Sequence, residues 1–536
     1  MCNPLGIDAF RAHYAIRRTA VRLEESGFSV VRFDYDGTGD SAGDAGDPDR
    51  VDAWLRSIDE ALKLVREAGA TWTAIWGMRS GALLASTAAD RDGSVDALCL
   101  VDPIPSGRMF LSEQRAMAAM AIGVQSKRED GSVETPGVVY DAGTVDALKK
   151  LRIGSDDHLP AKKILVLTRR GTTPDSGLAA RLSSDAAKWD EATGQEDLVD
   201  AEAPHQLIPY EDIERVVSWF SDSDVSPADT VAIKVPMRAG AVAVADGPDG
   251  RPVIERPLSL GPTGLFGIVT EVPGRVTGPT VVFFNVATEP HTGPARMWVR
   301  FARRWAALGV RSVRVDLSGL GDSPTRPGEP DFVIRLPANF DDVTEAVRAV
   351  SPDDPSNVVL AGLCSSAYQA LDSAMELRPR GVIALNPVLT FQPPEVLAGG
   401  ALSPKRRVAL PRGNVIQQFH NGLLAPLRQR FPNLGWRIRT MIARGARPSI
   451  WLKELTSSGV DLMLICGERE ARPIRQGTTP RSMSSLVRTG NFTFEYIPGL
   501  QHGLLVESHR EQIEKMVTEH LFARFASAHA TGGDRS

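Results

Sequence analysis

The sequence predicts two tandem α/β domains, each a doubly wound, mainly parallel sheet. Three observations predict this fold class. A Gly-rich segment occurs twice, as FDYDGTGDSAG at residues 33–43 and as VDLSGLGDSPT at residues 315–325. In each half, apolar strands alternate with helices of about 10 to 15 residues, the pattern of βαβ units. The length of 536 residues is also suited to two large domains.

The two halves are copies of one pattern. At an offset of 282 residues, five positions of the first Gly-rich segment recur in the second: Asp34, Gly37, Gly39, Asp40 and Ser41 match Asp316, Gly319, Gly321, Asp322 and Ser323. The same offset relates Asn3 to Asn285, and an offset of 285 relates WGMRSGA (76–82) to AGLCSSA (361–367). We therefore expect one fold to be present twice.

Each copy is expected to contain its elements in the same order. An amphipathic helix (15–27; 299–309) is followed by a strand (28–34; 310–316), a Gly-rich turn, another helix and a second strand that ends at the related turns above. Later strands are predicted at 96–103 and 163–170 in the first copy, and at 381–387 and 460–468 in the second. This succession favours sheets covered by helices on both faces.

The domain boundaries follow from a change in composition along the chain. We predict a first domain over 1–220, a polar, proline-containing linker over 221–230, a second domain over 231–527 and a flexible tail over 528–536. The second copy has two additional predicted antiparallel strands before VVFFN, whereas the first begins directly at MCNPLG. Either translation starts further upstream, or the first sheet lacks its leading strands and exposes an edge that something must cover.

Composition excludes several classes of protein. With 42% hydrophobic residues, 24% charged residues and a net charge of -5, nothing demands a nucleic-acid partner. The N-terminus lacks the apolar core of a signal peptide, and no apolar run is long enough to span a bilayer, so we expect a cytoplasmic protein without a transmembrane segment. The cysteines have neither CxxC spacing nor a disulfide pattern, and we expect no metal and no cofactor; they are Cys2, Cys99, Cys364 and Cys466.

The turn GLCSS is the first candidate for chemistry. A nucleophile must project from a strained turn between strand and helix, and its neighbours must be small so that backbone N–H groups can face a developing oxyanion. Gly362 and Ser366 are those small neighbours, which leaves Cys364 in the projecting position. The alternative is that Cys364 is a buried small hydrophobic residue, which is common for free cysteines.

On these motifs, both copies resemble α/β-hydrolases of the serine aminopeptidase-like group. The DxxGxGxS turn, the elbow and IPGLQHGLL (497–505) stand in the order nucleophile, acid, histidine. More narrowly, residues 285–323 and AGLCSSAYQAL resemble the cysteine-elbow hydrolase-like proteins of bacterial exopolysaccharide and exosortase-associated loci. The first copy resembles their arginine-elbow relatives, on residues 102–116 and 131–148. In this family each domain commonly carries a cap insertion.

The resemblance implies a catalytic triad in the second copy. His502 stands where the family places its general base, and a base in reach of Cys364 would stabilise the reactive thiolate. The acid is expected after the strand that ends near Gly467, with Glu468 and Glu470 as candidates. We favour Glu470, because the family's acid commonly stands three positions beyond this glycine.

The resemblance also implies the surroundings of the nucleophile. The oxyanion donors would be the backbone N–H of Ser365 and that of Val286 or Ala287. In the following HTGPAR segment, His291 and Arg296 are weaker candidates for shaping the substrate pocket.

The first copy has an arginine, Arg79, at the elbow position. A guanidinium stays protonated at neutral pH and is no acyl-transfer nucleophile. Ser80 is disfavoured because Met78 replaces the small neighbour, and His205 stands where a base would, with only Asp175 as an acid. We expect this degenerate site to be structural or to bind a ligand, with Arg79 available to an anionic group.

A basic segment separates the later strands of the second copy. Residues 386–460 contain eleven Lys and Arg but only Glu395 and Glu454 as acids. This fold commonly carries a substrate-covering cap here, and the charge bias favours an anionic substrate; a solvated face or pairing with the acidic first copy is the alternative.

Together these features predict an enzyme whose C-terminal copy uses a cysteine to cleave or transfer an acyl ester or thioester, a small-molecule substrate. The rival hypothesis is a non-catalytic binding or scaffold protein in glycan or secondary-metabolite biosynthesis. A weaker alternative is a serine esterase that uses Ser365 or Ser366.

Overall fold

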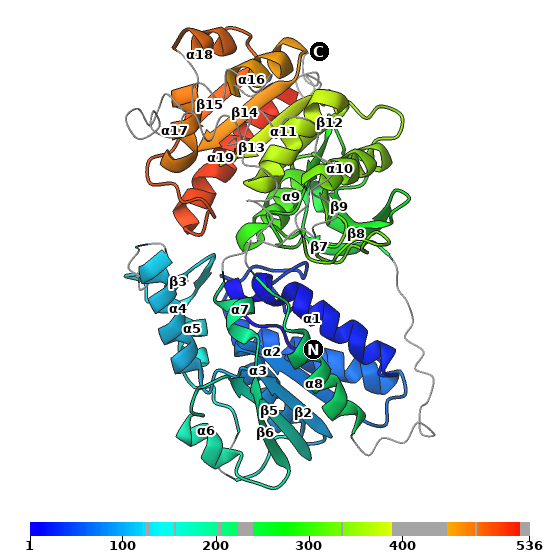
Figure 1. Ribbon diagram of the computed structural model, residues 1–536, viewed down its shortest axis with the longest axis vertical. Helices are drawn as coiled ribbons and strands as arrows, with labels where there is room; N and C mark the ends of the chain where they lie inside the picture. Colours follow the sequence, from blue (N-terminus) through cyan, green and yellow to red (C-terminus); the bar gives the residue numbers. More distant parts are fainter. Residues whose placement is uncertain are drawn as a thin grey trace, which may run out of the picture.

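The computed structural model describes residues 1–121, 123, 128–154, 157–201, 206–222, 240–333, 336–388, 448–477 and 480–525. These residues form two α/β domains stacked along the long axis of the molecule (Figure 1). We call the described residues up to 222 domain 1 and those from 240 onward domain 2. Most of the predicted linker, residues 389–447 of the predicted cap, and the predicted tail lie outside the described residues.

Domain 2 is built on one large sheet. Among the described residues its strand order is β15-β14-β13-β12-β10-β11-β9-β8-β7. The antiparallel strands are β7 (Val242–Ala245), β8 (Val253–Leu260) and β9 (Leu265–Glu271). The sequence had predicted two antiparallel strands in this region, and the structure has three. The parallel strands are β10 (Thr280–Phe283), β11 (Ser312–Val315), β12 (Val358–Leu363), β13 (Gly381–Leu385), β14 (Asp461–Cys466) and β15 (Phe492–Tyr496).

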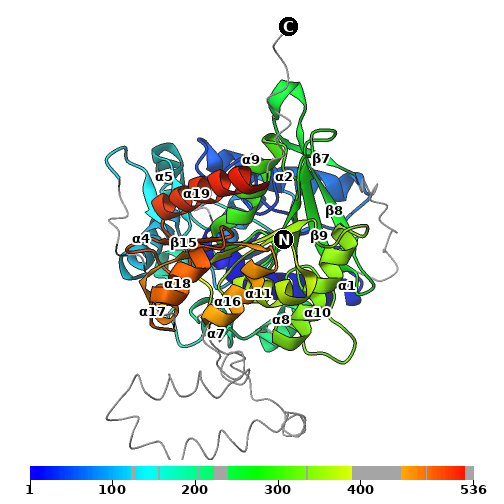
Figure 2. The ribbon, with the colours of Figure 1, turned by 90° about the horizontal axis from the view of Figure 1, so that it is seen from above.

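Helices cover both faces of this sheet, as Figure 2 shows from above. One face carries α9 (Met297–Ala307) and α19 (Glu507–Phe525); the other carries α10 (Leu336–Val350), α11 (Ser365–Leu377), α16 (Pro448–Ser457) and α18 (Pro480–Val487). Because successive residues of a strand point to opposite faces, the central strands are apolar throughout. In β10, Val281 and Phe283 pack in the α9/α19 layer, and Val282 packs in the opposite layer.

Domain 1 repeats the second half of that sheet. Its strand order is β1-β2-β5-β6, all parallel, and it matches β12 to β15 of domain 2. The strands are β1 (Ala74–Met78), β2 (Ala97–Val101), β5 (Lys163–Arg169) and β6 (Ala187–Ala192), with a separate hairpin of β3 (Val133–Thr135) and β4 (Val138–Tyr140). The helices are α1 (Ile7–Glu25), α2 (Arg50–Glu67), α3 (Ser80–Asp92), α4 (Gly107–Ala121), α5 (Ala142–Leu148), α6 (Ser176–Arg181), α7 (Gln195–Val199) and α8 (Tyr210–Ser221).

The predicted strand at residues 28–34 is not a strand in the structure. Its counterpart β11 pairs with β10 and β9, but in the described part of domain 1 only Met1–Asn3 occupy the place of β10. The Met1 amine donates to Val31 O at 2.8 Å, and Cys2 N–H donates to Trp76 O at 2.7 Å. Because residues 28–34 have no full neighbouring strand, they form no ladder of backbone hydrogen bonds. An apolar cavity of about 520 Å³, lined by Val30, Val31, Ile75 and others, occupies the corresponding place.

No helix among the described residues combines the length and the hydropathy needed to cross a membrane.

Candidate active site

Cys364 occupies the turn between β12 and α11. Its backbone has φ 56° and ψ -112°, a strained conformation for a residue with a side chain. Its N–H donates to Leu385 O at 3.0 Å, which fixes the turn to the next strand. The side chain is half-buried, whereas Cys2, Cys99 and Cys466 are buried. Among the four cysteines, Cys364 is thus the accessible one, and it sits in nucleophile-elbow geometry.

The flanking residues explain why this turn needs small side chains. A Cβ on Gly362 would lie 2.4 Å from the backbone carbon of Ser366, so glycine is required there. Ser366 is fully buried, and its hydroxyl bonds both the N–H and the carbonyl of Leu363, each at 3.0 Å. The Ser366 hydroxyl therefore stabilises the elbow and is not presented to a substrate.

His502 and Glu470 form a pair beside the elbow. The Nδ1 atom of His502 lies 2.8 Å from Oε1 of Glu470, whose side chain is 4% exposed. Hydrogen bonds with Cys364 and then with Glu470 raise the pKa of His502 to about 10, although burial opposes this. Glu468, the other candidate acid, is instead exposed and pairs with Arg472 at 3.7 Å. The structure thus brings Cys364, His502 and Glu470 together.

Asn386 links two loops of this site by hydrogen bonds. The sequence did not predict this role. Its side-chain amide donates to the carbonyls of Gln501 (3.0 Å) and His502 (3.1 Å), and its carbonyl accepts the N–H of Gly467 (2.8 Å). Asn386 therefore holds the histidine loop against the loop that carries Glu470. The only sequence signal is its place in NP directly after an apolar strand, where the first copy has Asp102 in DP.

The segment of residues 285–296, which we call the oxyanion loop, approaches the elbow at Ala287. Ala287 has φ 52°, and its N–H donates to the Ser365 hydroxyl at 2.9 Å. Of the two predicted donors in this loop, Ala287 is therefore the one directed at the elbow. Val286 is buried and accepts the N–H of Glu289. The Ser365 N–H belongs to the first turn of α11, where backbone donors have no partner within the helix.

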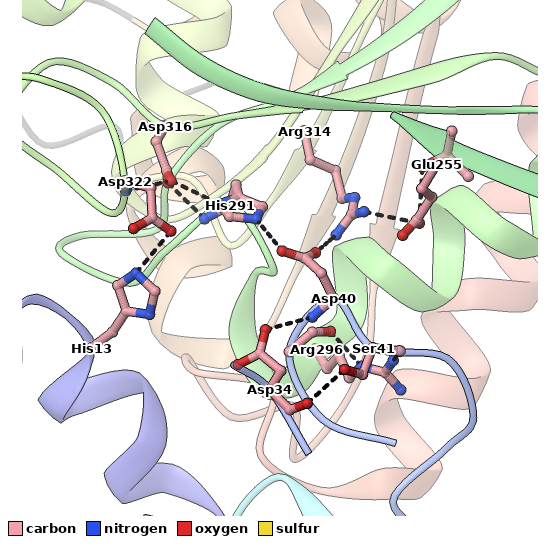
Figure 3. A network of polar contacts seen from close by, with 12 residues as sticks. His13, Asp34, Asp40, Ser41, Glu255, His291, Arg296, Arg314, Asp316 and Asp322 are labelled. Atoms are coloured by element: carbon pink, nitrogen blue, oxygen red, sulfur yellow. Dashed lines mark hydrogen bonds and ion pairs between the residues drawn. The ribbon is translucent and has the colours of Figure 1, made fainter. Parts of the chain in front are cut away.

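His291 and Arg296 lie at the interface between the domains (Figure 3). The ring of His291 bridges two carboxylates, with Nδ1 2.7 Å from Asp316 and Nε2 2.7 Å from Asp40 of domain 1. Arg296 donates to the backbone carbonyls of Gly39 (2.7 Å) and Gly43 (2.8 Å) and to that of Ser41. We expected these two residues to shape a substrate pocket. Both side chains bind domain 1, and both line a cavity of about 340 Å³ at this interface.

Charge stabilises this network. Burial would lower the pKa of His291, but Asp40 and Asp316 outweigh it and hold the pKa well above its usual value. Burial would raise the pKa of Asp40, but the positive charges of His291 and Arg314 outweigh the effect of burial and keep this pKa low. His291, Asp316 and Asp322 each place a potential metal-ligand atom within 4.8 Å of the others. Because both nitrogens of His291 already contact carboxylates, the cluster is better described as an ion-pair network.

Arg79 of domain 1 keeps the elbow conformation without the chemistry. Its backbone has φ 54° and ψ -125°, nearly that of Cys364. The guanidinium contacts Asp8 (3.2 Å), Asp102 (3.3 Å) and Glu113 (2.7 Å). We expected Arg79 to be available to an anionic ligand. Its guanidinium instead forms ion pairs with these three carboxylates. His205 lies outside the described residues, and Asp175 caps α6 by accepting the N–H of Leu178.

Comparisons with known proteins agree with this architecture. A model of the α/β hydrolase family matches residues 283–515. A second model, described as serine aminopeptidase, S33, matches residues 13–141. The two matches fall in different domains and together cover more than half of the chain. No curated protein matches the chain.

Several solved structures are similar to one half of the chain. An α/β serine hydrolase without a lid from Xanthomonas campestris is 15% identical and covers 51% of this chain and 94% of its own, with a TM-score of 0.29. The thioesterase domain from the curacin biosynthetic pathway is 17% identical over 50% of this chain and 99% of its own, with a TM-score of 0.30. A thermophilic esterase from Thermogutta terrifontis is 18% identical and covers 50% of this chain and 98% of its own, with a TM-score of 0.28.

The two family matches agree with the parallel sheets, the two elbow turns and the recurring Gly-rich segment. The chain therefore belongs to the α/β-hydrolase family and carries two α/β-hydrolase domains in tandem.

Proposed function

We propose that domain 2 is a cysteine-dependent hydrolase that cleaves an acyl ester or thioester through an acyl-cysteine intermediate. The family match supports the general class of hydrolase. The observation that carries the finer proposal is the half-buried Cys364 at a strained elbow beside the His502–Glu470 pair. The raised pKa of His502 favours an imidazolium beside the sulfur, which stabilises a thiolate.

The proposed reaction has two steps. In the first, the Cys364 thiolate attacks the acyl carbon. The resulting oxyanion is stabilised by the backbone N–H of Ser365 and by that of Ala287, which exchanges the Ser365 hydroxyl for the oxyanion. The bond to the alcohol or thiol then breaks, and the leaving group takes its proton from His502. In the second step, His502 removes a proton from water, which attacks the acyl-cysteine. The carboxylic acid leaves, and the thiolate is restored.

The sequence also supports an anionic substrate. Eleven Lys and Arg against two acids in residues 386–460 would attract a negatively charged group such as a phosphorylated carrier or an acidic saccharide. If another acceptor than water enters in the second step, the same residues would perform an acyl transfer.

The experiment is intact-mass analysis of the full-length protein after exposure to a panel of acyl thioesters and esters. We expect an adduct of one acyl group that maps to Cys364, and no adduct in Cys364→Ala. Circular dichroism and the thermal midpoint establish that this variant is folded. Turnover retained in Cys364→Ala would contradict the proposal.

Cys99→Ala provides the matched control. Cys99 is a free but fully buried thiol in β2, far in sequence from the elbow. This variant should keep both the adduct and the turnover. An adduct that maps to Ser365 would favour a serine esterase instead.

One observation favours the alternative of a non-catalytic binding or scaffold protein. The Ala287 N–H is already bonded to the Ser365 hydroxyl, so this oxyanion donor is occupied in the absence of substrate. Under that alternative the acyl panel gives no adduct, although Cys364 still reacts with a small alkylating reagent.

A further inference from the structure

The oxyanion loop of domain 2 contains unusual backbone strain. Ala287, Ala295 and Arg296 all have positive φ values, of 52°, 49° and 63°. Left-handed conformations of residues with side chains persist only where surrounding contacts hold them. The position of the Ala287 N–H therefore depends on what holds this loop.

Contacts within domain 2 hold the beginning of the loop. The Asn285 amide donates to Asp316 at 2.6 Å and to the carbonyl of Glu289 at 2.8 Å. Trp298 Nε1 donates to the carbonyl of Phe284 at 3.2 Å. Asn285 has the same relation to Asp316 that Asn3 has to Asp34 in domain 1, although that contact is longer, at 3.5 Å.

Domain 1 holds the rest of the loop at three successive points. The Thr288 hydroxyl donates to the side-chain oxygen of Gln206 at 3.2 Å, and both residues are buried. Further along, Asp40 contacts the His291 ring, and the turn around Gly39 to Gly43 receives the Arg296 guanidinium (Figure 3). Two of the three strained residues, Ala295 and Arg296, lie at this last contact.

The segments of domain 1 that make these contacts correspond to the Gly-rich turn and the histidine loop of domain 2. Asp40 belongs to the Gly-rich turn, and Gln206 directly follows the predicted but degenerate histidine, His205. Gln206 is itself fixed, since its amide donates to the carbonyl of Leu198 at 2.8 Å. The first copy thus retains a rigid surface where its own chemistry is missing.

We propose that domain 1 positions the oxyanion loop of domain 2, with Asp40 and Gln206 as the positioning residues. Neither residue touches the reacting atoms. They act by fixing Thr288 and His291, on the same loop as Ala287. This proposal rests on the proposed function as far as activity is concerned, but the positioning itself can be measured separately.

The pseudo-symmetry of the chain supplies a matched control. Arg314 contacts Asp40 at 2.6 Å, and the equivalent pair with the domains exchanged is Arg32 with Asp322, at 2.9 Å. Both ion pairs cross the same interface. Arg32 does not touch the oxyanion loop in any contact that the structure describes, so Arg32→Gln removes an interdomain ion pair without releasing the loop.

The test compares Asp40→Asn, Gln206→Ala and Arg32→Gln by hydrogen exchange of the backbone amides at 286–289. We expect exchange to become at least tenfold faster in the first two variants and to stay within about twofold of the wild type in Arg32→Gln. Gln206→Ala removes no charge, so it remains informative if Asp40→Asn is poorly folded. Unchanged exchange in Gln206→Ala would overturn the proposal.

Kinetics then connects the loop to the reaction. We expect kcat for an acyl thioester to fall about 10- to 100-fold in Asp40→Asn with little change in KM, as for a misplaced catalytic group. Alkylation of Cys364 by iodoacetamide needs no oxyanion donor and should be unchanged. Equal kcat in Asp40→Asn and Arg32→Gln would overturn the positioning role, whereas a wild-type protein without any turnover would refute the proposed hydrolase and leave hydrogen exchange to decide on positioning.

Discussion

At the scale of single residues, the site depends on how neighbouring groups set the charge of His502. The ring lies in hydrogen-bond contact with Glu470, and its hydrogen bonds to Cys364 and to Glu470 raise the pKa of His502 from 6.5 to about 10. A group whose pKa is raised by folding stabilises the folded state below its unfolded pKa, and this contribution is lost as pH rises through the folded value. For His502 the loss extends from about pH 6.5 to about pH 10.

Glu470→Gln tests this coupling. The substitution removes the negative charge beside the ring, so the pKa of His502 should fall toward its usual value. We expect the variant to be less stable than the wild type at pH 6, and the difference to shrink by pH 9. Urea denaturation at both pH values measures it. A difference that grows with pH would contradict the assignment.

The two serines of the elbow should behave differently from each other. Ser366→Ala removes the hydroxyl that bonds the Leu363 backbone and leaves a buried N–H without this partner, which should cost about 1–3 kcal/mol in urea denaturation. Ser365→Ala leaves the Ser365 backbone N–H in place and should retain the acyl adduct on Cys364. Loss of the adduct in Ser365→Ala with an intact fold would instead favour a serine nucleophile.

At the scale of elements, the two elbows show that a strained turn can be conserved in geometry after its chemistry has changed. Arg79 and Cys364 have similar backbone angles, and both turns bond the following strand through their N–H. In β1–α3 the guanidinium and its three carboxylates fill the place of a reactive side chain. The strand–turn–helix unit is therefore held by packing and backbone hydrogen bonds, and the projecting residue can vary.

Arg79→Met should destabilise domain 1 by about 3–5 kcal/mol, because it leaves the buried carboxylate of Asp8 without its cation, whereas Asp102 keeps Arg169 at 2.6 Å. Burial already raises the pKa of Asp8. The defect should therefore shrink between pH 7 and pH 5, as Asp8 takes up a proton. Chemical denaturation measures it, and Arg91→Ala, which removes an exposed ion pair of 3.4 Å, should have little effect.

The sequence predicted the elements that a local pattern determines. The elbow at Cys364 and the order of strands follow from small residues and apolar runs, and the resemblance led to His502 and Glu470. The sequence did not predict that residues 28–34 would form no strand, because strand pairing depends on a segment that is distant in the sequence. The roles of Asn386 and His291 arise from three-dimensional contacts, which residue type alone does not reveal.

At the scale of the whole molecule, the main described sheets of the two domains differ at the edge of the domain 1 sheet formed by β1. In domain 2, β10 fills the space between β11 and β12 with four buried residues, three of which are apolar. In domain 1 the same space is the cavity of about 520 Å³ beside Val30 and Ile75. The Met1 amine lies at its end, and burial lowers the pKa of this amine.

A designed extension can fill this cavity. Fusing Thr-Val-Val, the first three residues of β10, ahead of Met1 keeps the register, because Met1 matches Phe283 at the offset of 282. This extension should bury apolar side chains and replace the buried amine by a peptide N–H. We expect the thermal midpoint to rise by about 2–4 °C for each kcal/mol gained. The control extension Thr-Pro-Asp has a proline and a charge where the strand needs donors and apolar contacts, and it should give no increase. Equal midpoints for both extensions would contradict this account of the cavity.

The reciprocal contacts Asp40–Arg314 and Asp322–Arg32 have a consequence for how such a chain diverges. The interface is self-complementary, like that of a symmetric dimer whose two subunits have become one polypeptide. The two ion pairs join the Gly-rich turns to residues of the segments before them, and neither elbow takes part in these pairs. The residue that projects from either elbow can therefore differ between the two domains without any change to these two interdomain ion pairs.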